Sequence, residues 1–151
     1  MAGSIHSFLR GDGTDGRGRT LADVLAFDDD RIEHVHDFIQ WLFPLPERSQ
    51  AVPGSPVLGA AEAAAIRADA RALDGFRAAL ARMALFYDRT DAWLTGLDHN
   101  HLRITRILRA SRDLLGPDEA QAFHRRLLTR HDAAGAPINR RSLGFWQDAV
   151  G

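Results

Sequence analysis

Histidines gather at two places in this chain where their neighbours could support chemistry. The first is Glu33-His34-Val35-His36-Asp37 and the second is Asp98-His99-Asn100-His101. Imidazole is a common metal ligand and titrates near neutral pH, so His36, His99 and His101 could hold a metal or act in acid–base catalysis. Residues two apart on a helix point in nearly opposite directions, however, and the four-residue spacing of helical zinc sites is absent. We therefore expect no enzyme, no metal and no cofactor, and keep an enzyme or metalloprotein as the alternative.

An arginine series follows the second histidine cluster. Its members recur at every third position: Arg103, Arg106, Arg109 and Arg112. This period drifts around a helix, so the side chains form a spiral that could contact phosphates or an acidic peptide. The whole chain has a net charge of only −1, with nine acids and five arginines in residues 1–60 and eleven acids and fourteen arginines in residues 61–151. We expect these arginines to pair with acids, and binding of nucleic acid or phosphate through residues 103–112 is a second, less favoured alternative.

The composition is that of one water-soluble domain. The chain has 151 residues, of which 45% are apolar and 26% are charged. The absence of cysteine excludes disulfides, thiolate metal sites and a cysteine nucleophile. No charged and apolar leader opens the chain, and no apolar run approaches the ~20 residues of a membrane span, so we expect a cytoplasmic protein. The 19 basic residues are all arginine and alanine is abundant, which indicates a GC-rich, bacterial coding sequence.

Helical periodicity dominates the elements that must position these residues. We expect helices at seven places: 20–27, 30–42, 59–69, 71–87, 98–115, 117–132 and 142–150, with Thr20, the Asp28–Asp30 run and Ser142 as N-terminal caps. No strand is predicted, so the fold class is all-α, an irregular bundle of about six or seven helices. Residues 1–19 are expected to be a flexible N-terminal segment, and residues 20–151 a single helical domain. Gly75, inside a helix, predicts a close contact with another helix.

The expected helix over residues 30–42 carries both a core face and a polar face. Its core face is formed by Ile32, Val35, Ile39 and Leu42, at spacings of three and four. His36 and Gln40 are four apart and should stack on another face, with Trp41 on a flank. Pro44 ends the helix, because it disfavours α conformation in the preceding residue.

Two sequence blocks resemble the conserved domain of the opioid growth factor receptor family. The first block is His36-Asp37-Phe38-Ile39-Gln40-Trp41-Leu42-Phe43-Pro44, and the second is His99-Asn100-His101-Leu102-Arg103-Ile104-Thr105-Arg106-Ile107-Leu108. The resemblance extends more weakly over residues 21–150, and the family has tyrosine where this chain has Phe38. Two long blocks in the same order make the similarity specific, and this chain looks like a bacterial single-domain member.

The resemblance implies a receptor-like protein that binds an enkephalin-type peptide, with no catalytic residues to transfer. In animals the family is associated with nuclear and perinuclear membranes. We expect a peptide or small-molecule ligand and no transmembrane segment. The polar density of the two blocks predicts one shared ligand-binding site: His36, Gln40, Trp41, His99, Asn100, His101, Arg103 and Arg106.

Overall fold

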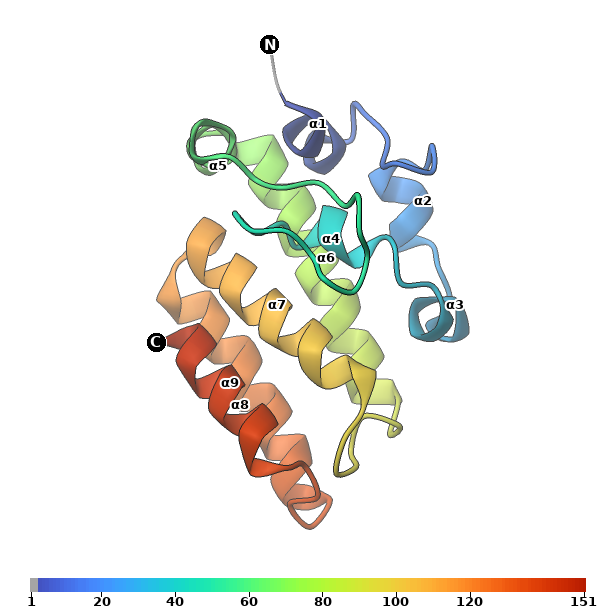
Figure 1. The fold of residues 1–151 in the computed structure, drawn as a ribbon, viewed down its shortest axis with the longest axis vertical. Coiled ribbons are helices and arrows are strands. Elements are labelled where there is room, and N and C mark those ends of the chain that lie inside the picture. The colour runs from blue at the N-terminus through green and yellow to red at the C-terminus, as the bar shows by residue number, and fades with distance from the viewer. Residues whose placement is uncertain (1–2) are drawn as a thin grey trace. The chain divides into compact units, whose positions relative to one another are not determined.

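The computed structural model describes residues 3–151, and these residues form nine α-helices and no strand (Figure 1). The helices are α1 (Ser4–Arg10), α2 (Leu21–Leu25), α3 (Asp29–His34), α4 (Ile39–Leu42), α5 (Ala60–Arg67), α6 (Ala70–Arg89), α7 (His99–Leu115), α8 (Pro117–Ala133) and α9 (Arg140–Val150). The all-α prediction is confirmed. The count exceeds seven because α1 was not expected and because the predicted helix over 30–42 is divided into α3 and α4.

The chain divides into two compact units, unit 1 (Met1–Arg82) and unit 2 (Met83–Gly151), with the boundary inside α6. From the sequence we expected one domain after residue 19. Within the described part of the chain, none of the helices combines the length and apolar character that a membrane crossing requires.

Unit 1 is built around α1, which contacts α2, α4 and α5. From the sequence we expected a flexible terminus here, but Ile5, Phe8 and Leu9 are each no more than 1% exposed. Burial of three large apolar side chains fixes α1 in the core, because each contributes about 1.5–3 kcal/mol of transfer free energy. A helix of seven residues is too short for apolar periodicity to predict from sequence that it is buried in the core.

Gly75 makes the close helix contact that the sequence predicted. A Cβ atom at this position would lie 2.0 Å from the carbonyl oxygen of Leu9 and 3.0 Å from Cδ2 of Leu21. The end of α1 therefore rests directly on the backbone of α6, at a distance that only glycine permits.

The predicted helix over 30–42 is interrupted between residues 35 and 38. Val35 is extended, with φ −96° and ψ 132°, and α4 begins only after Phe38. Phe38 is fully buried and meets the ring of Phe27 edge-on, with 5.3 Å between centroids. We attribute the break to tertiary contacts, because the packing of Phe38 and the ion pairs of Asp37 described below override local helix propensity.

Unit 2 is a bundle in which α7, α8 and α9 contact one another and run side by side in Figure 1. Asp98 caps α7, and its carboxylate accepts a hydrogen bond from the N–H of Asn100 at 3.0 Å. Gly116, with φ 104°, separates α7 from α8. The cap of α9 is Asn139 and not the predicted Ser142, since the Asn139 side chain accepts from the N–H of Ser142 at 2.8 Å. Ser142 is instead a buried residue of the helix.

Candidate functional site

The first motif block lies in unit 1, and its three predicted site residues differ in exposure. His36 is exposed, Trp41 is half-buried, and Gln40 is only 5% exposed. His36 lies outside any helix, before α4, so it and Gln40 do not stack on one helix face, contrary to the expectation from sequence. Trp41 packs edge-on against Phe8, with 5.7 Å between ring centroids. Trp41 therefore contributes to the packing of α4 on α1.

The side-chain amide oxygen of Gln40, Oε1, is a buried hydrogen-bond acceptor without a donor among the described residues. A buried acceptor without a donor costs about 1–3 kcal/mol, so this oxygen is a weak point in unit 1.

An ion network that was not predicted from sequence borders the first block. Arg17 Nε donates to Asp37 Oδ2 at 2.9 Å, and Arg19 Nη2 donates to Asp37 Oδ1 at 2.8 Å. Arg19 also donates to the buried carboxylate of Asp15 at 2.7 Å. Partial burial raises the pKa of Asp37, but the hydrogen bonds from the two arginines outweigh it and hold the pKa below its ordinary value. The only indication of this network in the sequence was the alternation of glycine with charged residues over 11–19. The structure shows that ion pairs hold this loop in place.

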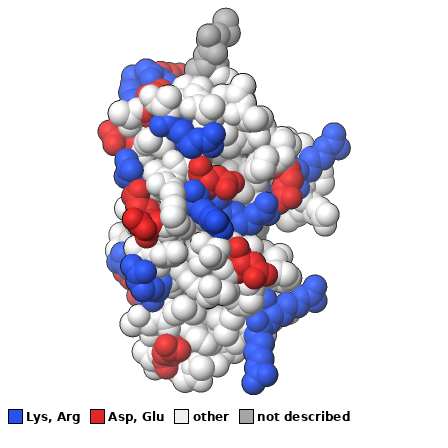
Figure 2. Space-filling view, turned by 90° about the vertical axis from the view of Figure 1, so that its left-hand side faces the viewer, with Lys and Arg blue, Asp and Glu red and all other residues white. Residues whose placement is uncertain are grey.

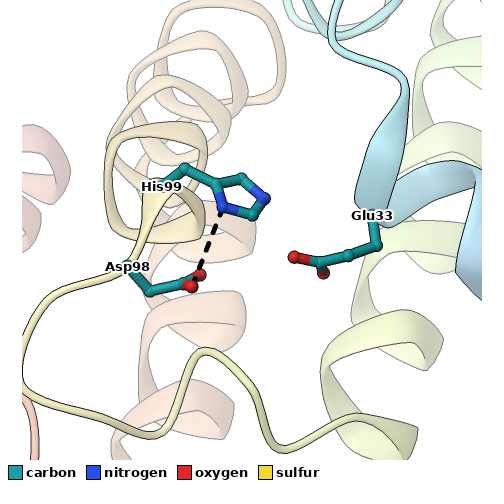
Figure 3. Close-up of side chains that lie close together, drawn as sticks. All are labelled: Glu33, Asp98 and His99. Carbon is teal, nitrogen blue, oxygen red and sulfur yellow. Dashed lines mark ion pairs between the residues drawn. The ribbon is translucent and has the colours of Figure 1, made fainter.

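The second block forms the first half of α7 in unit 2. Three of its predicted site residues are nearly inaccessible: Asn100 is 0%, His101 1% and Arg103 7% exposed. His99 is exposed and Arg106 is half-buried. Figure 3 shows the His99 ring beside the carboxylate of Asp98, an ion pair of 3.7 Å when the ring is protonated. Most of the polar density of this block is thus used inside unit 2.

His101 is the centre of a buried hydrogen-bond chain. Its Nε2 lies 2.8 Å from the carbonyl oxygen of Trp93, which can only accept, so the ring carries a proton on Nε2. Its Nδ1 then accepts from the hydroxyl of Ser142 at 3.2 Å, and Ser142 Oγ accepts from Asn139 Nδ2 at 2.9 Å. Trp146 Nε1 donates to the His101 carbonyl at 3.0 Å. The chain joins the start of α7 to α9, and both ring nitrogens are occupied.

Asn100, also at the start of α7, forms hydrogen bonds with Tyr87 and Asp98. Its Oδ1 accepts from the hydroxyl of Tyr87 at 3.0 Å, and its Nδ2 donates to Asp98 at 2.9 Å. Trp93 Nε1 donates to the carbonyl oxygens of Tyr87 and Thr90 at 3.2 and 2.9 Å. Buried polar groups that are satisfied in this way specify one packing arrangement. The Asn-His part of the motif is therefore explained by the architecture of unit 2.

An accessible surface hollow lies between α7 and α9 in unit 2. It has a volume of about 520 Å³ and is lined by Thr105, Arg109, Arg112, Asp113, Phe145, Asp148 and Ala149. Two of its residues, Arg109 and Arg112, belong to the predicted arginine spiral. The contribution of α9 was not predicted, because no local pattern shows which helix will lie beside residues 105–113. We call this feature the α7/α9 hollow.

Two exposed large apolar side chains lie on the same two helices. Leu102 is 67% exposed on the first turns of α7, and Phe145 is 41% exposed on α9. The Arg141 guanidinium lies over the Phe145 ring, 5.5 Å from its centroid. An exposed aromatic ring with cations nearby is typical of surfaces that bind peptides or other proteins.

The predicted joint site requires residues of both units, and it stays a prediction. Unit 2 brings His99, Asn100, His101, Arg103 and Arg106 together on one helix, but it buries three of them. Comparison of the chain with family models, with curated protein sequences and with solved structures returns no match. The resemblance to the opioid growth factor receptor family therefore rests on the two blocks themselves.

Proposed function

We propose that this chain is a peptide-binding module of the kind that the two motif blocks imply, and that unit 2 provides its binding surface. The observation that carries the proposal is the α7/α9 hollow, where arginines meet the exposed ring of Phe145. Its volume of about 520 Å³ falls within the usual range of ligand sites. Arginine and aromatic residues are the types that contribute most to binding energy in protein interfaces.

Two observations favour binding over the metal or enzyme alternative. Both ring nitrogens of His101 are engaged and the side chain is 1% exposed. To bind a metal or transfer a proton with a ligand, His101 would have to break bonds that join α7 to α9. The alternative then loses one of its three histidines.

The nucleic-acid alternative is also weakened by the structure. Arg103 is 7% exposed, so it cannot present a free guanidinium along the helix. Basic and acidic side chains are interspersed on the face shown in Figure 2, and the net charge is −1. Phosphate-backbone binding instead needs several clustered cations.

Isothermal titration calorimetry of the full chain with the enkephalin pentapeptide Tyr-Gly-Gly-Phe-Met tests the proposal. We expect saturable binding that Phe145→Ala weakens at least about tenfold, because a buried aromatic contact contributes about 1.4 kcal/mol or more. Leu85→Ala is the matched control, since Leu85 is 42% exposed in the same unit but lies on α6. The proposal fails if no peptide binds, or if both variants bind like the parent chain. Stoichiometric metal in the purified protein would favour the metalloprotein instead.

A further inference from the structure

The charges in the α7/α9 hollow are not equivalent. Arg109 and Asp113 each already have an interaction of their own. Arg112 on α7 and Asp148 on α9 have no ion pair among residues 3–151, either with each other or with a third residue. The hollow is therefore lined by one cation and one anion, from two different helices, that form no ion pair among residues 3–151.

We propose that the α7/α9 hollow recognises both ends of a short unblocked peptide. The ligand's terminal carboxylate binds Arg112, its terminal ammonium binds Asp148, and an apolar side chain covers the ring of Phe145. This inference rests on the proposed peptide-binding function and names the ligand class, a zwitterion of two or three residues.

Charge complementarity supports this occupant. A guanidinium forms paired hydrogen bonds with a carboxylate, which gives Arg112 a directional partner. An acidic ligand without an ammonium group would place its negative charge beside the carboxylate of Asp148. A purely basic ligand would place its positive charge beside the guanidinium of Arg112. A zwitterion satisfies both groups at once.

The surroundings set the size and the apolar contact. A volume of about 520 Å³ is sufficient for a di- or tripeptide but small for a folded partner. The ring of Phe145, 41% exposed, and the small side chain of Ala149 provide an apolar wall. The backbone of Gly151 lies against the Arg112 guanidinium, where an added Cβ would come within 3 Å of three guanidinium atoms.

The test is a saturation-transfer NMR titration of the full chain with one tripeptide pool, Gly-X-Leu with X as Ala, Val, Leu, Met or Phe. The pool is made in four forms: unblocked, N-acetylated, C-amidated and blocked at both ends. We expect each block to weaken binding by roughly 1.5- to fivefold, the range for exposed charge pairs. Binding of the form blocked at both ends should be weakest.

Two variants assign each end to its residue. With Arg112→Gln, the unblocked and C-amidated forms should bind equally, while N-acetylation still weakens binding. With Asp148→Asn, the unblocked and N-acetylated forms should bind equally, while amidation still weakens binding. A variant that merely loosened unit 2 would weaken all four forms alike. Arg125→Gln, an exposed arginine on α8, should leave the whole pattern unchanged.

The outcomes separate this inference from the proposed function. If all four forms bind equally well, recognition of the ends is wrong and peptide binding stands. If the tripeptides fail to bind while the pentapeptide of the calorimetric test binds, the inference again fails alone. If neither binds, both proposals are overturned.

Discussion

At the scale of single residues, Gly75 is the position where local propensity and tertiary packing disagree most sharply. Propensity alone predicts that Gly75→Ala stabilises α6 by about 1 kcal/mol. The added Cβ would lie 2.0 Å from the Leu9 carbonyl oxygen, so one backbone segment must move. We expect the free energy of unfolding to fall by about 1–3 kcal/mol, as for other overpacked sites. Urea denaturation measures this loss.

Gly144→Ala is the matched control, because Gly144 also lies inside a helix but a Cβ added there would meet no atom of another element within 4 Å. This change should stabilise the protein by up to about 1 kcal/mol. Equal effects at positions 75 and 144 would show that the contact between α1 and α6 is looser than described.

The buried hydroxyls of Ser142 and Ser111 offer a second residue-scale comparison. Ser142 donates to His101 Nδ1, so Ser142→Ala leaves that buried nitrogen unpaired and should cost about 1–3 kcal/mol of unfolding free energy. Ser111 is 0% exposed and its Oγ has no partner among the described residues. Ser111→Ala should therefore be neutral or stabilising. Thermal denaturation of both variants checks the order, and a larger loss for Ser111→Ala would contradict it.

Residue-scale prediction from sequence succeeded where the cause was local, and it did not identify hydrogen-bond partners that lie far along the chain. The glycine inside a helical pattern correctly indicated a close approach at Gly75. The motif residue His101 was predicted to bind ligand, yet it bonds to Ser142, 41 positions away, and to the carbonyl of Trp93. Polar density in a motif does not distinguish a surface site from a buried network, because both require hydrogen-bonding side chains.

At the scale of elements, Asp69 joins α1 to the start of α6 in two separate ways. Its Oδ1 accepts from the N–H of Arg71 at 3.0 Å and thereby caps α6. Its Oδ2 receives Arg10 Nη1 at 2.6 Å and lies 2.7 Å from His6 Nε2. Hydrogen bonds from Arg10, and then from His6, hold the pKa of Asp69 far below its ordinary value.

Two substitutions of Asp69 separate the cap from the ion pair. Asparagine is a good N-terminal cap but carries no charge, whereas alanine provides neither function. At pH 7 we expect stability to decrease from the parent chain to Asp69→Asn and further to Asp69→Ala, as measured by urea denaturation. If the two variants are equally stable, the capping bond contributes nothing.

The same element scale shows why residues 30–42 were mispredicted as one helix. Ile32, Ile39 and Leu42 are buried as expected, so the apolar pattern was interpreted correctly. The break at Val35 depends on contacts with Phe27, Arg17 and Arg19. These residues lie too far along the chain to affect the apolar periodicity of residues 30–42. Sequence periodicity identifies a core face more reliably than it identifies helix continuity.

At the scale of the whole molecule, the fold class and most helix positions followed from sequence, because 3.6-residue periodicity and capping residues act locally. The expected pairing of the arginine spiral over residues 103–112 with acids does not extend to Arg112, which forms no ion pair among residues 3–151. Unit 1 contains pairs between acids and other arginines. Asp12 pairs with Arg71 at 3.0 Å and Asp29 with Arg82 at 2.9 Å. The α7/α9 hollow could not be predicted, because it depends on which helices become neighbours in space.

The dependence of overall stability on pH should include contributions from His124 in unit 2 and Asp69 in unit 1, beside those of other carboxylates with lowered pKa values, such as Asp37. His124 on α8 is 6% exposed, and burial, followed by the nearby charge of Arg125, lowers its pKa below the ordinary 6.5. Between that lowered value and 6.5 the unfolded chain binds more protons than the folded one, so stability falls as the pH drops below 6.5. The lowered pKa of Asp69 adds a second loss as the pH falls below its ordinary value of 3.8, again because the unfolded chain takes up the proton first.

Chemical denaturation of three chains across pH 8 to pH 3 resolves the two contributions. His124→Gln should flatten the slope just below pH 6.5 and leave the acid limb near pH 4 intact. Asp69→Asn should reduce the loss of stability below pH 3.8 and leave the slope just below pH 6.5 intact, because it removes one carboxylate and keeps the histidine. Asp12, Asp23 and Asp37 still contribute to the acid limb. The value of each variant at pH 8 is its own reference, so any cost of the substitution itself cancels. A parent-like slope below pH 6.5 in His124→Gln would mean that another group titrates there, and the burial of His124 would then not be what makes the folded protein sensitive to mild acid.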